Sequence, residues 1–422
     1  MQVQGDSPRL EWRQVVVGAV AIWCTTRLGL IALTYFTGIM NAHGAVLTGQ
    51  GFVATVSSPE KLLQSWVRWD ATWYLRISSR GYADPHLAGY FPLYPVLVGV
   101  LAWLFGDGAG PVWPAFDALR TILSLVVSNL ASLFAIASVG LLTTNEVAGR
   151  RSDAPPATHA MLALVAFPFA FFLAAGYSDG LFLGLAAMAL LFARRGRWAW
   201  ACGMAVLAGT CRPTAAALVL PLGYEFGRQL GWWGGGIAWR EGLGRLRWRE
   251  AAGAICVLGA APVGVGLFAI ATTASIGDPL AYLHAQRQFL FHTFEPPWTT
   301  ALLVLSHLHR TQAWSYWQAL TLLDLTLATI TFVVAITHAR RLPLMLTLYV
   351  FGVLALSAAV PIEGLPDVLT GIGRYQLACA PLFVGLALVA ERRPNLWPGL
   401  VGASFMLQAV LATFWLSGGY LE

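Results

Sequence analysis

Hydrophobic runs of about 20 residues follow one another along nearly the whole chain, separated by short polar segments. A helix of that length crosses the hydrocarbon core of a bilayer. The first run has no small-residue cleavage site after it, so it predicts a retained anchor. We expect an all-α polytopic membrane protein with about nine to eleven transmembrane helices. The runs that predict crossings are 14–37, 117–143, 158–175, 181–193, 251–276, 316–338, 342–360, 374–391 and 397–416.

Two further apolar stretches are interrupted. The stretch 90–105 contains two prolines and is short for a hydrocarbon core of about 30 Å, and 198–226 is broken at Thr210-Cys211-Arg212-Pro213. If both crossed fully, some arginine-rich turns would lie outside. If both are re-entrant or interfacial, every arginine cluster stays on one side. We favour the second interpretation, because broken helices are tolerated where they line a cavity buried in protein.

The charged residues support a membrane topology. Only 11% of the residues are charged, whereas a soluble domain carries about 25%, which excludes an ordinary soluble enzyme, a disordered chain and a nucleic-acid binder. Short arginine-rich loops stay cytoplasmic, so the net charge of +6 reports topology and predicts anionic lipid headgroups as the surface partner. The clustered arginines are Arg9, Arg13, Arg150, Arg151, Arg194, Arg195, Arg197, Arg228, Arg240, Arg245, Arg247, Arg249, Arg340, Arg341, Arg392 and Arg393.

The domain organisation that follows is simple. We expect one transmembrane domain over 1–422, with no internal repeat of the kind that transporters show. Within it, 38–116 forms a long first outer loop with interfacial or re-entrant helices, and 228–250 forms a basic cytoplasmic loop. The 5 cysteines lack paired spacing and are expected to be small buried hydrophobic residues.

The densest group of polar and aromatic residues on the predicted outer side surrounds one carboxylate. Arg68, Trp69, Asp70, Trp73 and Tyr74 lie within seven consecutive positions, and the three aromatic residues have the spacing of one helical face. An interfacial amphipathic helix with an aromatic belt is the alternative interpretation.

Other candidate site residues lie where apolar segments begin, end or break. Arg212 lies at membrane depth, where an unpaired arginine costs several kcal/mol, so it is either part of a structural ion pair or a ligand for phosphate or carboxylate. For the rest, the alternatives are structural bends, solvated turns, a plain loop helix and a belt arginine. They are His86, Tyr94, Tyr177, Asp179, His284, Gln286, Arg374 and Tyr375.

Several common catalytic motifs are absent from the sequence. It contains no Walker loop, no Rossmann glycine pattern, no HExxH and no nucleophile elbow. It also lacks an Asp-x-Asp pair that could hold a metal-bound nucleotide sugar. We therefore expect neither a cofactor nor a metal.

The order of these motifs resembles that of the PIG-V-like mannosyltransferases, the GPI mannosyltransferase 2 family and its bacterial relatives. The resemblance covers about residues 14 to 391, and its most specific part is the combination of WD, GY and FPLYP. The segments that carry it are WDATWYLRISSRGY, FPLYP, FPFAFFLAAGYSDGLFL, RRGRWAWACGMAVLAGTCRPT, GDPLAYLHAQ and GRYQLACAPLF.

The resemblance implies a GT-C fold and a transferase that takes mannose from a polyprenyl- or dolichyl-phosphate-mannose donor on the outer or luminal side. It implies inversion of configuration and no obligatory metal. The family's base is an aspartate in the first outer loop, which Asp70 matches. The family's turn commonly reads YTES, and this chain departs from it with Tyr177-Ser178-Asp179-Gly180.

Together, the residues and the resemblance predict a mechanism. Asp70 would activate a hydroxyl of a glycolipid acceptor, and Arg212 and Arg374 would bind the departing phosphate. The other candidates, Trp69, Trp73 and Tyr74 among them, would bind substrate. A non-catalytic scaffold subunit of a glycan-assembly complex and a lipid or sugar transporter remain the alternatives. The expected location is the plasma membrane for a bacterial source and the endoplasmic reticulum for a eukaryotic one.

Overall fold

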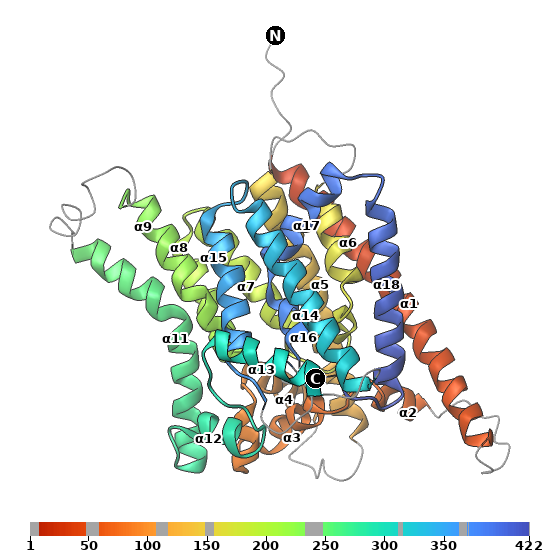
Figure 1. The fold of residues 1–422 in the computed structure, drawn as a ribbon. Helices are drawn as coiled ribbons and strands as arrows, with labels where there is room; N and C mark the ends of the chain where they lie inside the picture. Colours follow the sequence, from red (N-terminus) through yellow and green to blue (C-terminus); the bar gives the residue numbers. More distant parts are fainter. Residues whose placement is uncertain are drawn as a thin grey trace.

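The computed structural model describes residues 8–47, 59–106, 117–147, 156–232, 248–310, 315–362, 369 and 371–421. The regular secondary structure of this part of the chain is helical, apart from one isolated β-bridge, which confirms the predicted all-α, multi-span architecture (Figure 1). The elements are α1 (Pro8–Leu47), α2 (Pro59–Gln64), α3 (Asp70–Arg80), η1 (Pro85–Gly89), α4 (Leu93–Leu104), α5 (Ala118–Val147), α6 (Pro156–Ala166), η2 (Ala170–Leu173), α7 (Asp179–Arg194), α8 (Trp198–Cys211), η3 (Pro213–Leu218), α9 (Val219–Gln229), α11 (Trp248–Ile276), α12 (Ala281–Gln288), α13 (Pro297–Arg310), α14 (Tyr316–His338), α15 (Leu344–Ala358), α16 (Ile372–Tyr375), η4 (Gln376–Ala378), α17 (Ala380–Arg392) and α18 (Trp397–Leu416).

Five helices of the described chain are long and apolar enough to cross a membrane. A sixth candidate is the pair formed by 372–378 and 380–392, which is bent by 84°. The sequence predicts about nine to eleven crossings. The structure has fewer long helices because several apolar runs that are predicted to be full spans form shorter helices. The five long segments are Trp12–Met40, Ala118–Val147, Trp248–Ile276, Tyr316–His338 and Trp397–Leu416.

The shorter apolar helices pair into three hairpins. In each, the chain reverses through a short break, which is η2 between α6 and α7, η3 between α8 and α9, and α16 with η4 between α15 and α17. The stretch 198–226 is therefore not one continuous helix, and its turn lies at Arg212. Non-helical backbone at membrane depth is tolerated where protein surrounds it, and these turns lie among buried residues.

Proline and glycine account for two of these turns. Pro213 cannot donate to the preceding helical turn and disfavours helical geometry at the residue before it, so Arg212 is extended, with φ −155° and ψ 149°. Gly371 has a φ of 84°, which only glycine adopts readily, immediately before the short helix α16. The first turn takes Arg212 out of helical geometry, and the second precedes the short helix that carries Arg374.

The C-terminal ends of three helices meet in a group of ion pairs, which we call the arginine-end cluster. It consists of Glu146 on α5, Arg194 on α7, and Glu225 and Arg228 on α9. Arg194 pairs with Glu146 at 2.8 Å and with Glu225 at 3.0 Å, and Arg228 pairs with Glu225 at 2.7 Å. Arg150, Arg151 and most of the predicted 228–250 loop lie outside the described residues.

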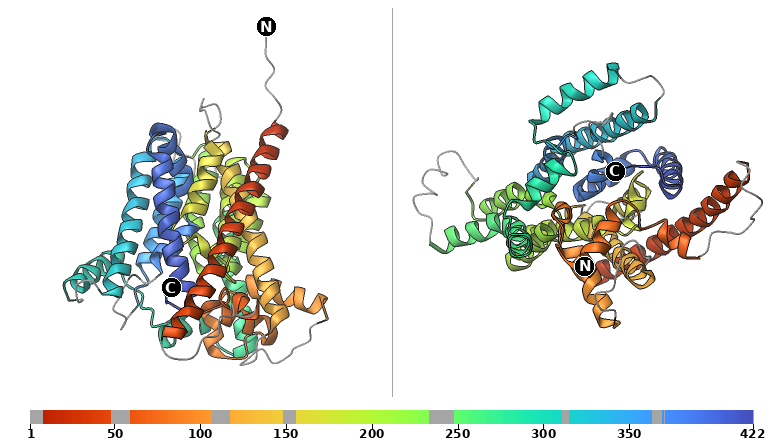
Figure 2. Two further views of the ribbon diagram at one scale, coloured as in Figure 1. Left: turned by 90° about the vertical axis from the view of Figure 1, so that its right-hand side faces the viewer. Right: turned by 90° about the horizontal axis from the view of Figure 1, so that it is seen from below.

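A layer of shorter helices lies at the opposite end of the bundle. Figures 1 and 2 show α2, α3, α4, α12 and α13 there, far from the end at which α1 begins. The helix α4 has only 12 residues and packs against α3 and α5. The segment 90–105 thus contributes to this layer, and the layer covers the hairpin turns from one side.

Candidate active site

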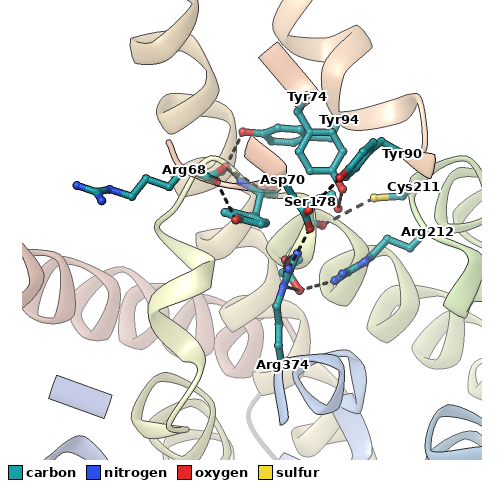
Figure 3. Close-up of polar contacts among 12 residues, drawn as sticks. Arg68, Asp70, Tyr74, Tyr90, Tyr94, Ser178, Cys211, Arg212 and Arg374 are labelled. Carbon is teal, nitrogen blue, oxygen red and sulfur yellow. Dashed lines mark hydrogen bonds and ion pairs between the residues drawn. The ribbon is translucent and has the colours of Figure 1, made fainter. Parts of the chain in front are cut away.

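Two carboxylates and two arginines alternate in a chain of ion pairs at the hairpin turns. Asp70 Oδ2 lies 3.2 Å from Arg374 Nη1, and Asp179 Oδ2 lies 3.0 Å from Arg374 Nη2. Arg374 Nε also donates to Asp179, at 3.3 Å to Oδ2. Arg212 Nη1 pairs with the other oxygen of Asp179 (Figure 3). We call these four residues the site cluster.

Each member of the site cluster comes from a break in helical structure. Asp70 and Asp179 are the first residues of α3 and α7, where the helix dipole favours a carboxylate. Arg212 lies between α8 and η3, and Arg374 lies on the four-residue helix α16. The local sequence thus places a charge at each break, and the packing of the hairpins brings the four charges together.

Burial makes these pairs obligatory. The exposed fractions of the side chains are 1% for Asp179, 3% for Arg374 and 12% for Arg212, against 28% for Asp70. A buried charge needs a partner of opposite sign, and removing one partner of a buried pair costs about 3–5 kcal/mol. Asp179 therefore pairs with both arginines and orients them, and Asp70, the most exposed member, supplies the second negative charge.

Aromatic residues complete the surroundings of Arg374. Its guanidinium lies 4.4 Å from the ring centroid of Tyr177 and 4.9 Å from that of Phe172, within cation–π range. The hydroxyl of Tyr177 donates to the carbonyl oxygen of Arg68 at 2.9 Å, which ties the turn before α7 to the segment before α3. Tyr177 thus contacts both Arg374 and the segment before α3.

A cavity of about 230 Å³ opens beside the site cluster. Asp70, Arg212 and Arg374 line it, and Asp179 lies behind the two arginines. The lining residues are Asp70, Tyr74, Gly89, Tyr90, Phe91, Cys211, Arg212, Pro213, Thr214, Tyr282, Gln286, Leu290, His292, Leu356, Ser357, Val360, Ile362, Gly371, Arg374, Tyr375 and Tyr420.

Among the predicted site residues, the structure brings six to the cavity. They are Asp70, Tyr74, Arg212, Gln286, Arg374 and Tyr375. Tyr74 is buried, with its hydroxyl 3.1 Å from Ser178 Oγ, and burial raises the pKa of its phenol above the usual value. Tyr74 therefore stays protonated at neutral pH and is a hydrogen-bonding group rather than a base.

The predicted aromatic face does not form one surface, because Trp69 precedes α3 rather than belonging to it. Trp69 has a φ of 54°, is 40% exposed and packs edge-on against Tyr420 at 5.1 Å. Trp73 stacks on Tyr90, with ring centroids 6.4 Å apart. Neither tryptophan lines the cavity.

The remaining candidates also lie outside the cavity lining. The side chain of Arg68 points away from the site cluster (Figure 3). Tyr94 is buried and donates to the carbonyl oxygen of Ser124 at 2.8 Å, which is a packing role. His86 pairs with Asp84, and His284 pairs with Asp278; both histidines are exposed.

Several lining residues carried no signal that the sequence analysis used. Tyr90 donates to Asp70 Oδ1 at 3.1 Å, and only its position just before FPLYP pointed to it. Tyr282 lies on α12, the helix that also carries the predicted residue Gln286. His292 and Tyr420 line the cavity from segments that contain no motif. Their presence depends on how α12, α15 and α18 pack.

Within the described part of the chain, no three His, Cys, Asp or Glu side chains are grouped so that they could hold a metal ion. The positive charges beside Asp70 and Asp179 are arginines. The absence of a metal requirement remains a prediction.

These features define a multi-span helical membrane protein with a buried acid–arginine site beside a cavity. Residues 28–226 match the family model described as mannosyltransferase (PIG-V). The match contains Asp70, Asp179 and Arg212 and ends before Arg374.

A curated relative and solved structures show further similarity. The chain is 32% identical over 146 residues to GPI alpha-1,6-mannosyltransferase 2 of Cricetulus griseus, a match of 34% of this chain and 28% of that protein. The match thus spans less than a third of the relative's length. ArnT of Cupriavidus metallidurans, solved with undecaprenyl phosphate, is 12% identical with a TM-score of 0.46, covering 93% of this chain and 75% of that one. An Archaeoglobus fulgidus oligosaccharyltransferase is 14% identical with a TM-score of 0.41, covering 95% and 53%.

Proposed function

We propose that this chain is a GT-C-type mannosyltransferase that moves mannose from a polyprenyl-phosphate-mannose donor to a lipid-linked glycan acceptor, with inversion. The observation that carries the proposal is the site cluster: one accessible carboxylate and two buried arginines border a single cavity. Transfer from a sugar phosphate needs a base for the incoming hydroxyl and cations for the departing phosphate. The match of residues 28–226 to the mannosyltransferase (PIG-V) family model supports mannose as the sugar.

Asp70 is the proposed base. Its carboxylate accepts the proton of an acceptor hydroxyl while that oxygen bonds to C1 of mannose. The bond between C1 and the phosphate oxygen breaks, and its electron pair leaves with polyprenyl phosphate. A single displacement of this kind inverts the configuration at C1, and Asp70 then releases the proton to water. Proton removal by a positioned side chain contributes roughly 10²–10⁴-fold to such a step.

Arg374 and Arg212 are the proposed phosphate-binding residues. Asp179 holds Nε and Nη2 of Arg374, so Nη1, which pairs with Asp70, is the nitrogen best placed to turn to a phosphate. In this scheme, the donor phosphate competes with Asp70 for Nη1, and its arrival leaves the carboxylate free to accept a proton. Guanidinium groups suit this role because they bind phosphate through paired hydrogen bonds.

We place the cavity on the outer or luminal side of the membrane. Arg194 and Arg195 end α7 beside the end of α9, whose last turn carries Arg228, and Figure 1 shows α9 ending on the other side of the bundle from α3 and α12. Short arginine-rich turns stay cytoplasmic, so the cavity end faces outward. The corresponding membrane is the plasma membrane in a bacterium and the endoplasmic reticulum in a eukaryote.

The test is mannose transfer by purified protein in detergent from synthetic polyprenyl-phosphate-mannose. The acceptor panel contains a phosphatidylinositol glycolipid, a phosphatidylinositol mannoside, a synthetic oligomannoside lipid and a hydroxyl-bearing peptide. We expect wild-type turnover with a lipid-linked glycan and at least a roughly hundredfold fall in Asp70→Asn, which keeps the shape of the side chain and removes the base. The anomeric configuration of the product, read by NMR, tests inversion.

Asp84→Asn is the matched control. Asp84 lies in the same outer layer and also pairs with an arginine, Arg76, at 3.2 Å, but it does not line the cavity. We expect Asp84→Asn to keep wild-type turnover. A wild-type protein that shows no turnover with any acceptor of the panel would favour a scaffold or a transporter. An Asp70→Asn variant that keeps wild-type turnover would show that Asp70 is not the base.

A further inference from the structure

His292 is a cavity residue that the mechanism above does not use. It lies between α12 and α13 and lines the same cavity as Asp70. Its backbone N–H donates to the carbonyl oxygen of Gln286 at 2.9 Å, and its Nδ1 lies 3.3 Å from the carbonyl oxygen of Val360. The backbone of His292 and its ring are thus each held by one backbone carbonyl group.

The segment that carries His292 is paired with the end of α15. His292 forms an antiparallel bridge with Ile362, Thr293 N donates to Pro361 O at 3.0 Å, and Glu295 N donates to Ala359 O at 2.9 Å. We call residues 292–295 the strap. A side chain on such a paired segment holds its position better than one on a free loop, which is what a substrate-contacting group requires.

Backbone geometry sets His292 apart in the same way as Asp70. Within the described residues, Trp69 and Phe291 are the non-glycine residues with positive φ, each at 54°. Trp69 directly precedes Asp70, and Phe291 directly precedes His292. Such conformations are costly and concentrate at functional sites, where the surrounding structure maintains them. The cavity is thus lined by two polar residues that each follow a strained aromatic residue.

The ring has one nitrogen left for a ligand. A carbonyl oxygen can only accept, so Nδ1 carries the proton that it donates to Val360, and Nε2 of the neutral ring has a free lone pair. Nε2 makes no hydrogen bond with any residue that the structure describes. Burial lowers the pKa of His292 below its usual value, so the ring is neutral at neutral pH.

We infer that His292 is a substrate-contacting residue whose Nε2 accepts a hydrogen bond from a hydroxyl of the carbohydrate acceptor. This inference rests on the proposed function. It assigns His292 to the acceptor because His292 lines the same cavity as Asp70, the proposed base, whereas the donor phosphate is assigned to Arg212 and Arg374. A neutral ring that accepts one hydrogen bond recognises a hydroxyl and gives no advantage to an anion.

The test compares two variants with one control in the transfer assay, using the panel acceptor that the wild type turns over fastest. His292→Gln places an amide oxygen near the position of Nε2, and His292→Phe retains a ring without an acceptor atom. Thr293→Val alters the next residue of the strap, which does not line the cavity, and keeps the backbone pairing. Thermal unfolding in detergent reports whether each variant is folded.

We expect the acceptor KM of His292→Phe to rise about tenfold, which is the effect of one hydrogen bond to a buried group. Its donor KM should stay within about twofold, and His292→Gln and Thr293→Val should stay within about threefold of wild type in both constants. A folded His292→Phe with an unchanged acceptor KM overturns the inference, as does a rise in the donor KM alone. A wild type that transfers no mannose overturns the proposed function, and this inference with it.

Discussion

The arginine-end cluster and the site cluster contain the same charges, two acids and two arginines, but they expose opposite members. At the arginine end, the glutamates are 2% and 0% exposed, and Arg194 and Arg228 are 20% and 45% exposed. In the site cluster, the arginines are 3% and 12% exposed, and Asp70 is 28% exposed. The first cluster exposes its arginines at the protein surface, where anionic lipid headgroups can balance their charge. The second keeps its cations buried and presents a carboxylate.

The two clusters also differ in what lies next to them. No member of the arginine-end cluster lines the cavity, and its acids are closed in by three helix ends. Three members of the site cluster line the cavity. The comparison teaches that ion pairing alone does not mark a catalytic site in this chain. The proposed active site is distinguished by an accessible carboxylate and by buried cations that border the same cavity.

The largest expected difference comes from neutralising the central acid of each cluster. Asp179→Asn and Glu225→Gln each leave buried arginines short of a partner, so each should lower the free energy of unfolding by roughly 3 kcal/mol. Asp179→Asn should also lower the turnover of the folded protein at least about a hundredfold, because both proposed phosphate-binding arginines lose their position. Thermal unfolding and turnover per folded molecule separate the two effects. Equal turnover losses in both variants would erase the distinction between the clusters.

Exchanging an arginine for lysine in each cluster should give a smaller difference. The single ammonium group of lysine in Arg374→Lys cannot replace the two nitrogens that contact Asp179 and also reach a phosphate. The donor KM should therefore rise about tenfold. Arg228→Lys keeps its charge at an exposed position, and its donor KM should match wild type. Steady-state kinetics with varied polyprenyl-phosphate-mannose measures both. An unaltered donor KM in Arg374→Lys would argue against phosphate binding by Arg374.

The pH dependence of acceptor binding should sharpen the assignment of the cavity wall. Burial lowers the pKa of His292, while the nearby carboxylate of Asp70 opposes that shift. The ring is therefore neutral above its usual pKa of about 6.5 and gains a proton only at lower pH. The acceptor KM of wild type should be flat from neutral pH down to about 6.5 and rise a few-fold below it. His292→Gln should lose this rise, and an identical acid profile in the variant would assign the rise to another group.

The smallest expected effect is that of metal removal. Arginines supply the positive charge beside Asp70 and Asp179, so turnover in excess EDTA should equal turnover without it. Adding Mg²⁺ or Mn²⁺ to protein treated with EDTA is the control. A loss of turnover in EDTA that either ion restores would contradict the prediction.

Local sequence patterns predicted those parts of the site that depend on neighbouring residues. Proline after Arg212 predicted a break, and the break gives Arg212 its extended backbone. The group around Asp70 predicted a site carboxylate, with an interfacial amphipathic helix as the alternative, and Asp70 begins α3 and lines the cavity. For Arg212, the sequence left an ion pair or a phosphate ligand open, and the structure supplies the ion pair with Asp179.

Other parts could not be predicted, because their contacts join residues far apart in the chain. Asp179 was expected either to contact substrate or to be a solvated turn residue, yet it is buried behind two arginines, 33 and 195 residues away. Tyr90 and His292 gave no separate signal, because a tyrosine or histidine beside an apolar run is common in any membrane protein. Their importance follows from a hydrogen bond to Asp70 and from the paired strap.

The sequence by itself determined that the chain spans a membrane, that its arginines gather in short turns, and that helices break at positions occupied by charged residues. These properties depend on the hydrophobicity of consecutive residues and on the local geometry of proline and glycine. Only the tertiary structure decided which charges meet. The pair between Asp70 and Arg374 joins positions 304 residues apart. It forms because two hairpin turns and the layer of shorter helices pack around one cavity.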